Sequence, residues 1–119
     1  MSDLLRNGAA YLAGKLKAHA GTTVTITRGN QSATVVATIG RSVFEAADAT
    51  GVVESWESRD YLLPTADLPF GEPQRFDRIT ETMGGAQCVY EVASPRGVPL
   101  FHYADAFQEI TRIHTKRIG

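Results

Sequence analysis

The sequence predicts a mainly β fold of the α+β class, in which an N-terminal helix over 1–20 precedes a small antiparallel β-barrel or sandwich of about six strands over 22–115. Three observations lead to this prediction. Apolar residues recur with helical spacing near the N-terminus, and from Thr22 onward they alternate with period 2 instead. The predicted strands are joined by glycine turns and longer loops, without the strand–helix–strand rhythm of a parallel sheet. A length of 119 residues favours a single domain over 1–119.

Residues 2–19 have the pattern of an amphipathic helix with one apolar stripe. The stripe consists of Leu5, Ala9, Leu12 and Leu16. Gly21 is a suitable residue to end the helix. Gly8 and Gly14 each weaken an isolated helix by about 1 kcal/mol. We therefore expect the stripe to need a covering surface, either the sheet of its own chain or a neighbouring subunit.

The first two predicted strands form a β-hairpin. Thr22–Arg28 and Gln31–Ile39 alternate in hydrophobicity, and Gly29-Asn30 between them suits a two-residue turn. Gly40 is expected to end the second strand. The small and acidic residues that follow predict a first long loop over 40–51.

The longest predicted strand is Val52–Leu63, which contains the single tryptophan, Trp56. Both of its faces are apolar at the ends and polar in the middle. This pattern predicts a central strand whose ends lie in a core and whose middle meets water or another chain. Val53, Tyr61 and Leu63 are the expected core contacts.

A second hairpin is predicted after the proline-rich turn region 64–73. Its strands are Phe76–Thr82 and Gln87–Ala93, joined by the turn Gly84-Gly85.

A second long loop is predicted over 94–105, and it contains the aromatic cluster Phe101, His102 and Tyr103. The last strand is expected over Phe107–His114.

Composition limits the classes of partner. Twelve basic and 13 acidic residues give a net charge of −1, which does not favour nucleic acid, because non-specific binding to nucleic acid is electrostatic. The single cysteine, Cys88, allows neither an intramolecular disulfide nor a cysteine metal cluster. The sequence has no cleavable signal pattern and no apolar run of about 18 residues, so we expect a soluble protein of intracellular origin, without a membrane segment.

No catalytic, cofactor or metal site is predicted. The three histidines are His19, His102 and His114. None has a nucleophile or further metal ligands at a suitable spacing, and no glycine-rich phosphate loop is present. The carboxylates of Glu54, Glu57 and Asp60 are expected on a solvated or interfacial face, with Arg59 available for ion pairs. We therefore expect a protein that is not an enzyme and has no cofactor.

The aromatic residues leave two interpretations open. Four of them fall on predicted strands: Trp56, Tyr61, Phe76 and Tyr90. A barrel of the OB type could stack the bases of single-stranded nucleic acid on such residues, which is the alternative function. Packing within the sheet is the plainer interpretation, and exposed apolar loops favour a protein partner. Phe44 and Phe101 are the first residues to test in that case.

Three stretches in a fixed order carry a resemblance to a known family. Ala20–Ser32 reads AGTTVTITRGNQS, Phe76–Thr80 reads FDRIT, and Tyr90–Val92 reads YEV after a glycine turn. In this order the chain resembles, over nearly its whole length, the small head–tail joining proteins of tailed bacteriophages of the lambda attachment type, and the related stopper and adaptor proteins. Phe76 stands where a glycine is common, and the loop Arg96–Asp105 looks longer than in the lambda type, so the resemblance leaves the subtype open.

The resemblance implies a non-enzymatic component of the virion neck, which assembles in the bacterial host cytoplasm as a ring, often a hexamer. Its implied partners are a portal or adaptor protein on the capsid side and a tail-tube or tail-terminator protein on the tail side, with DNA passing through the ring. The candidate interface residues are Phe44, Trp56, Arg59, Phe101, His102, Tyr103, Lys116 and Arg117. No role carries over to the C-terminal segment from His114 to Arg117.

Overall fold

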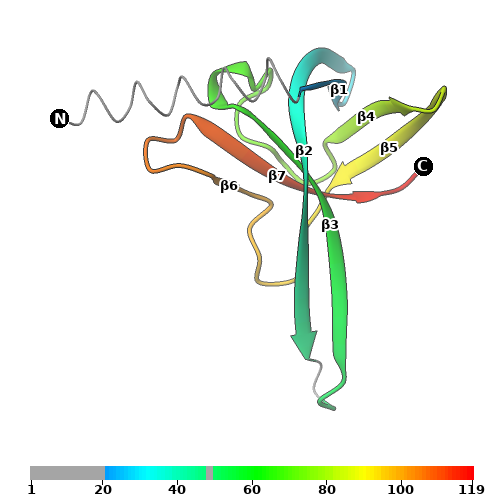
Figure 1. Cartoon of the computed structure of the whole chain (residues 1–119), viewed down its shortest axis with the longest axis vertical. Helices are drawn as coiled ribbons and strands as arrows, with labels where there is room; N and C mark the ends of the chain where they lie inside the picture. Colours follow the sequence, from blue (N-terminus) through cyan, green and yellow to red (C-terminus); the bar gives the residue numbers. More distant parts are fainter. Residues whose placement is uncertain (1–20, 48–49) are drawn as a thin grey trace.

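Seven β-strands make up most of the chain in the computed structural model, which describes residues 21–47 and 50–119 (Figure 1). The strands are β1 (Thr22–Arg28), β2 (Gln31–Ala47), β3 (Val53–Pro64), β4 (Arg78–Met83), β5 (Ala86–Val92), β6 (Phe101–Tyr103) and β7 (Ile110–Arg117). A short 3-10 turn, η1 (Thr65–Asp67), follows β3. The helix predicted over 1–20 lies outside the described residues.

The strands close into an antiparallel barrel. Their order is β3-β2-β1-β4-β5-β7, and an additional pairing between β3 and β7 joins the two ends, so six strands form the ring. The short strand β6 pairs with the other side of β7. Closure gives edge strands a partner and removes most of the open edge of the sheet. The predicted mainly β barrel is confirmed, and a sandwich is not formed.

Two glycine turns set the local register, as predicted. Arg28 pairs with Gln31 across Gly29-Asn30, and Met83 pairs with Ala86 across Gly84-Gly85. Gly84 and Gly85 have φ angles of 58° and 83°, the left-handed values that a primed hairpin turn requires. The local sequence therefore specifies both hairpins.

Strand β2 does not end at Gly40. It runs on to Ala47, and Arg41–Ala47 pairs residue by residue with Val53–Arg59 of β3. The loop predicted over 40–51 is therefore wrong over 40–47, because β3 supplies the backbone hydrogen bonds that a loop would lack. We call these two paired segments, 41–47 and 53–59, the arm. It projects from the barrel as a two-stranded ribbon (Figure 1).

The core fills the inside of the barrel and stops at the base of the arm. Its buried residues are Val24, Ile26, Ala37, Tyr61, Leu63, Ile79, Cys88, Tyr90, Val92 and Ile113. Tyr61 and Leu63 are core contacts, as predicted, and Cys88 is a buried free thiol. Val53 is not, because it lies at the far end of the arm with 61% of its surface exposed.

The polar middle of β3 is solvated only in part. Glu54 and Glu57 are exposed, as predicted, whereas the polar residues beyond them are not. Ser58 and Asp60 are both 0% exposed, which overturns the prediction of a solvated or interfacial face at Asp60. The physical reason is that β7 pairs with β3 from Arg59 onward and covers this segment.

The predicted loop over 94–105 contains β6, and the last strand begins later and ends later than predicted, at Ile110 and Arg117.

Asp105 makes the turn between the two strands, since its carboxylate accepts the backbone N–H groups of Phe107 and Ile110 at 3.0 and 2.8 Å. Burial raises the pKa of Asp105, and these and other backbone hydrogen bonds outweigh it, so the pKa lies below its ordinary value.

Candidate functional site

A buried carboxylate fixes the base of the arm. The Oδ2 atom of Asp60 accepts a hydrogen bond from Nε of Arg112 at 2.6 Å, and Oδ1 lies 2.9 Å from Nδ1 of His114. The hydroxyl groups of Ser42 and Ser58 also donate to it. Asp60 thus joins β2, β3 and β7 at the point where the arm leaves the barrel.

The hydrogen bonds keep Asp60 ionised in spite of its burial. Burial by itself raises the pKa of Asp60, and the donors His114, Ser42, Ser58 and Arg112 outweigh burial, so the pKa lies well below its ordinary range. An ionised carboxylate can only accept hydrogen bonds, which means that Nδ1 of His114 carries a proton.

The cluster around Asp60 contains the residue types of a hydrolytic triad, Ser58, His114 and Asp60. Their geometry differs from that of a triad. In that triad, serine and aspartate bond to different nitrogens of the imidazole. Here Oγ of Ser58 and Oδ1 of Asp60 both face Nδ1 of His114, at 3.5 and 2.9 Å. All three side chains are buried, so a substrate has no access to the hydroxyl. The group is a structural tie between strands.

A second ion pair lies inside the open end of the barrel. Nε of Arg59 and the hydroxyl of Tyr61 both donate to Oε1 of Glu81, at 2.6 and 2.7 Å. Burial raises the pKa of Glu81, and the bonds from Arg59 and Tyr61 outweigh it, so the pKa lies below its ordinary value. Arg59 thus forms an ion pair, as predicted, and its partner is Glu81 on β4.

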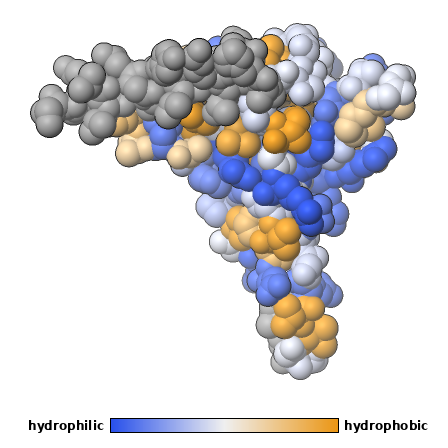
Figure 2. Space-filling view, in the orientation of Figure 1, coloured by the Kyte–Doolittle hydropathy of each residue, from blue (hydrophilic) through white to orange (hydrophobic). Residues whose placement is uncertain are grey.

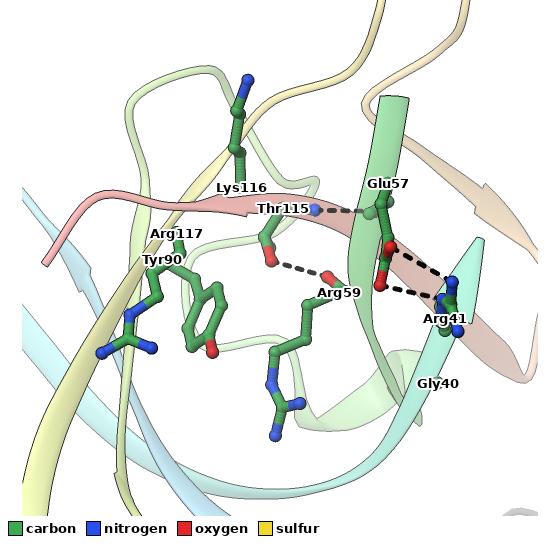
Figure 3. Close-up of a pocket in the computed structure, with 9 residues that line it drawn as sticks. Gly40, Arg41, Glu57, Arg59, Tyr90, Thr115, Lys116 and Arg117 are labelled. Atoms are coloured by element: carbon green, nitrogen blue, oxygen red, sulfur yellow. Dashed lines mark hydrogen bonds and ion pairs between the residues drawn. The ribbon is translucent and has the colours of Figure 1, made fainter. Parts of the chain in front are cut away.

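A hollow of about 360 Å³ opens between the base of the arm and the end of the barrel (Figure 3). It is lined by Gly40, Arg41, Glu57, Ser58, Arg59, Tyr90, Thr115, Lys116 and Arg117. Arg59, Tyr90 and Arg117, which come from β3, β5 and β7, point to the same side in this view. We call this space the cationic hollow, since four of its lining residues are Arg or Lys and one is Glu.

The four cations of the hollow differ in their partners. Arg41 pairs with Glu57 at 2.8 Å on the surface, and Arg59 pairs with the buried Glu81. Lys116 and Arg117 form no ion pair with an acidic side chain of the residues described. The hollow therefore retains a positive charge at its outer edge.

The arm carries a strip of aromatic rings on one side. Phe44 contacts Trp56 at 6.1 Å between ring centroids and meets the ring of His114 edge-on at 5.2 Å. Nζ of Lys116 lies 5.5 Å from the centre of the Trp56 ring, and His102 lies 5.2 Å from His114. The structure thus brings Phe44, Trp56, His102 and Lys116 of the predicted interface residues together.

The other predicted interface residues lie elsewhere. Arg59 and Arg117 line the hollow, whereas Phe101 and Tyr103 pair with each other at 5.9 Å on β6. Phe101 packs against the core rather than lying on an exposed loop tip. The sequence did not reveal the cluster around Asp60, because its members are brought together only by the pairing of β3 with β2 and β7.

The four aromatic residues of the nucleic-acid alternative do not form a stacking surface. Tyr61 and Tyr90 are buried and contact each other at 6.0 Å, while Phe76 is 72% exposed and lies before the start of β4. Trp56 is half-buried under Lys116. A row of exposed rings along a basic groove, which single-stranded nucleic acid requires, is not present in the described part of the chain.

The outer half of the arm is incompletely paired and partly apolar. β1 pairs with β2 only as far as Ala37, and β7 pairs with β3 only from Arg59, so the ribbon beyond has no third strand beside it in the described chain. Val43 and Val53 are 53% and 61% exposed. Figure 2 shows hydrophobic patches along the arm, below a hydrophilic band at its base. Such a surface is typical of a protein interface.

Other kinds of site were sought among residues 21–47 and 50–119. This part of the chain contains no group of three or more His, Cys, Asp and Glu side chains placed to hold a metal ion. Within the same residues, no helix combines the length and the apolar character that crossing a bilayer requires.

The described chain is thus a small closed barrel with a projecting, partly apolar ribbon. Residues 2–119 match the sequence profile of the family described as phage head-tail joining protein, which covers nearly the whole chain. The chain therefore belongs to that family, as its resemblance predicted, and its role in the phage neck is structural. A comparison with individual curated proteins gave no match.

Proposed function

We propose that the chain is a ring-forming subunit of the neck, which joins the portal side of the DNA-filled capsid to the tail. Membership of the head–tail joining family supports the place in the virion. The arm is the observation that carries the rest of the proposal.

The arm needs a partner for physical reasons. An isolated two-stranded ribbon is at best marginally stable in water, and exposed strand edges invite pairing with another chain. Val43 and Val53 add exposed apolar surface on the same ribbon. A contact between the arm and a different surface of the next chain is heterologous, and repeated heterologous contacts form a ring when the rotation between neighbours closes.

The proposed neighbours are a portal or adaptor protein on the capsid side and a tail-tube or tail-terminator protein on the tail side. DNA passes through the ring. The chain does not itself catalyse a reaction in this role.

Electron microscopy of particles made without this chain tests the proposal. We expect filled heads and separate tails, and adding the purified chain should restore joined particles. Joined particles in the absence of the chain would contradict the proposal.

A shortened arm separates the role of the arm from that of the barrel. Glu45 and Ser55 face each other in the pairing of β2 and β3, so a two-residue Asn-Gly turn can replace residues 46–54. We expect this variant to fold with nearly the thermal stability of the wild type and to leave heads and tails unjoined. A shortened variant that joins them normally would show that the arm is dispensable.

A further inference from the structure

We propose that the cationic hollow of one chain receives the tip of the arm from a second copy of the same chain. This inference rests on the proposed ring and names the contact that builds it. Both surfaces belong to the same chain. The tip of the arm carries acidic side chains, and the hollow carries basic ones.

Charge complementarity is the first argument. Glu45 and Glu54 lie on the outer half of the arm, both are exposed, and neither forms an ion pair with a residue that the structure describes. Lys116 and Arg117 at the edge of the hollow are also exposed and lack an acidic partner there. Opposite charges arranged in this way select the partner and its register more than they add affinity.

Shape is the second argument. On β2 the arm spans seven residues, from Arg41 to Ala47, and the distance between its first and last residue corresponds to roughly 20 Å of strand. A projection of this length can reach the hollow of a neighbour. The hollow is bordered by β7 and by the base of the neighbour's own arm, so one chain would contact the next through two different surfaces.

The hollow is less well suited to DNA. Two of its four cations are already paired, Arg41 with Glu57 and Arg59 with Glu81. The whole chain has a net charge of −1, whereas binding to a phosphate backbone depends on an excess of basic residues along the track. An acidic protein segment needs only the two remaining cations, Lys116 and Arg117.

A charge exchange tests the contact. The arm variant carries Glu45→Lys and Glu54→Lys, and the hollow variant carries Lys116→Glu and Arg117→Glu. In each variant the arm and the hollow have the same sign of charge, so neither should assemble with itself. In an equimolar mixture every arm can meet a hollow of opposite charge, and assembly should return.

The readout is the joining of heads and tails from particles made without the chain, after purified protein is added. We expect each variant alone to join at least about tenfold fewer particles than the wild type, and the mixture to recover most of this loss, because like charges at an interface are strongly unfavourable. Salt should weaken the recovery in the mixture, since these charges are exposed.

Thermal melting of each variant is the control for folding. If Lys116→Glu lowers the melting temperature through the loss of its contact with Trp56, the hollow variant is made with Arg117→Glu alone, whose side chain is exposed at the end of β7. A smaller loss of joining is then expected, because Lys116 keeps its positive charge. Normal joining by either folded variant alone, or a mixture of folded variants no better than its components, would overturn the contact.

The outcomes also separate this inference from the proposed function. If the wild-type chain joins particles and the charge variants join them equally well, the proposed neck function stands and only the arm–hollow contact is excluded. A hollow variant that joins normally but loses salt-sensitive binding to DNA would assign the hollow to DNA and overturn the contact. A wild-type chain that fails to join heads and tails would remove both.

Discussion

Asp60 of β3 and Arg112 of β7 form an ion pair of 2.6 Å, in which the carboxylate is fully buried and the guanidinium is one quarter exposed. The same guanidinium donates to the backbone oxygen of Arg41 at 3.1 Å. One side chain of the last strand therefore holds both strands of the arm at its base. The orientation of the arm depends on a contact between residues that are 52 positions apart.

Asp60→Asn should lower the free energy of unfolding by about 3 kcal/mol, because the partly buried guanidinium of Arg112 loses its charged partner and the donors around Asp60 lose a charged acceptor. Denaturant unfolding measures this loss. Glu57→Gln is the matched control on the same strand, since its pair with Arg41 is exposed and should contribute less than about 1 kcal/mol. Equal effects of the two substitutions would mean that burial does not distinguish the two ion pairs.

Acid should destabilise the protein through Asp60 and Glu81. Both have a pKa below the ordinary value in the folded state, so the stability they provide is fully present above the unfolded pKa and is lost as the pH falls through the folded pKa. For Asp60 the ordinary pKa is 3.8. We expect a free energy of unfolding that changes little between about pH 7 and pH 5 and then falls toward lower pH.

The Asp60→Asn variant tests how much of the loss of stability in acid comes from Asp60. Below the ordinary pKa of Asp60, its curve of unfolding free energy against pH should fall less steeply than that of the wild type, by up to about 1.4 kcal/mol per pH unit. Parallel curves for the two proteins would exclude Asp60 as a source of acid sensitivity.

Tyr61→Phe should lower the free energy of unfolding by about 2 kcal/mol, because the hydroxyl donates to the charged and buried Glu81. Tyr103→Phe is the control, since the Tyr103 hydroxyl makes no hydrogen bond to a described residue and its removal should have little effect. Chemical denaturation at neutral pH compares the two. A loss for Tyr61→Phe no greater than for Tyr103→Phe would contradict the role of this bond.

Phe44→Asp and Phe101→Asp should have different consequences. Phe44 lies on the arm, so we expect a small loss of stability and a strong loss of head–tail joining. Phe101 packs against the core, so we expect its substitution to cost about 3 kcal/mol, in contrast to the sequence-based expectation of an exposed loop residue. Thermal melting beside the joining assay distinguishes them, and a large drop in melting temperature for Phe44→Asp would place that ring in the core.

Phe76→Gly should raise the free energy of unfolding by up to about 1 kcal/mol. Phe76 has a φ angle of 77°, which is costly for a bulky L-residue, and its ring is 72% exposed, so the barrel loses little packing when the ring is removed. The gain is limited by the greater freedom of glycine in the unfolded chain. Thermal unfolding measures it, and a clear decrease in stability would show that the ring makes contacts that offset the strain.

Local sequence was sufficient for the two hairpins and for most of the strands. Gly29-Asn30 and Gly84-Gly85 predict turns because glycine accepts left-handed backbone angles, and the alternating residues beside them supply the strands. Phe76 is the exception, since its φ angle of 77° is one that glycine adopts more easily than a bulky residue does.

The arm and its base were beyond sequence reasoning for a physical reason. The small residues around Ala46 resemble a loop until β3 pairs with them, and Asp60 resembles part of a solvated face until β7 covers it. Pairing between distant strands does not depend on any local pattern, so the partners of Asp60 cannot be read from its neighbours in the chain.

The sequence by itself therefore determined the mainly β class, the hairpin turns, the core contacts Tyr61 and Leu63, and the family, and it left barrel and sandwich open. Only the tertiary structure decided that residues 41–47 and 53–59 form a projecting arm, that Asp60 is buried, and that Arg59, Lys116 and Arg117 meet around one hollow. Hydrogen bonding within a hairpin is local, whereas the register between β3 and β7 is fixed only when the barrel closes.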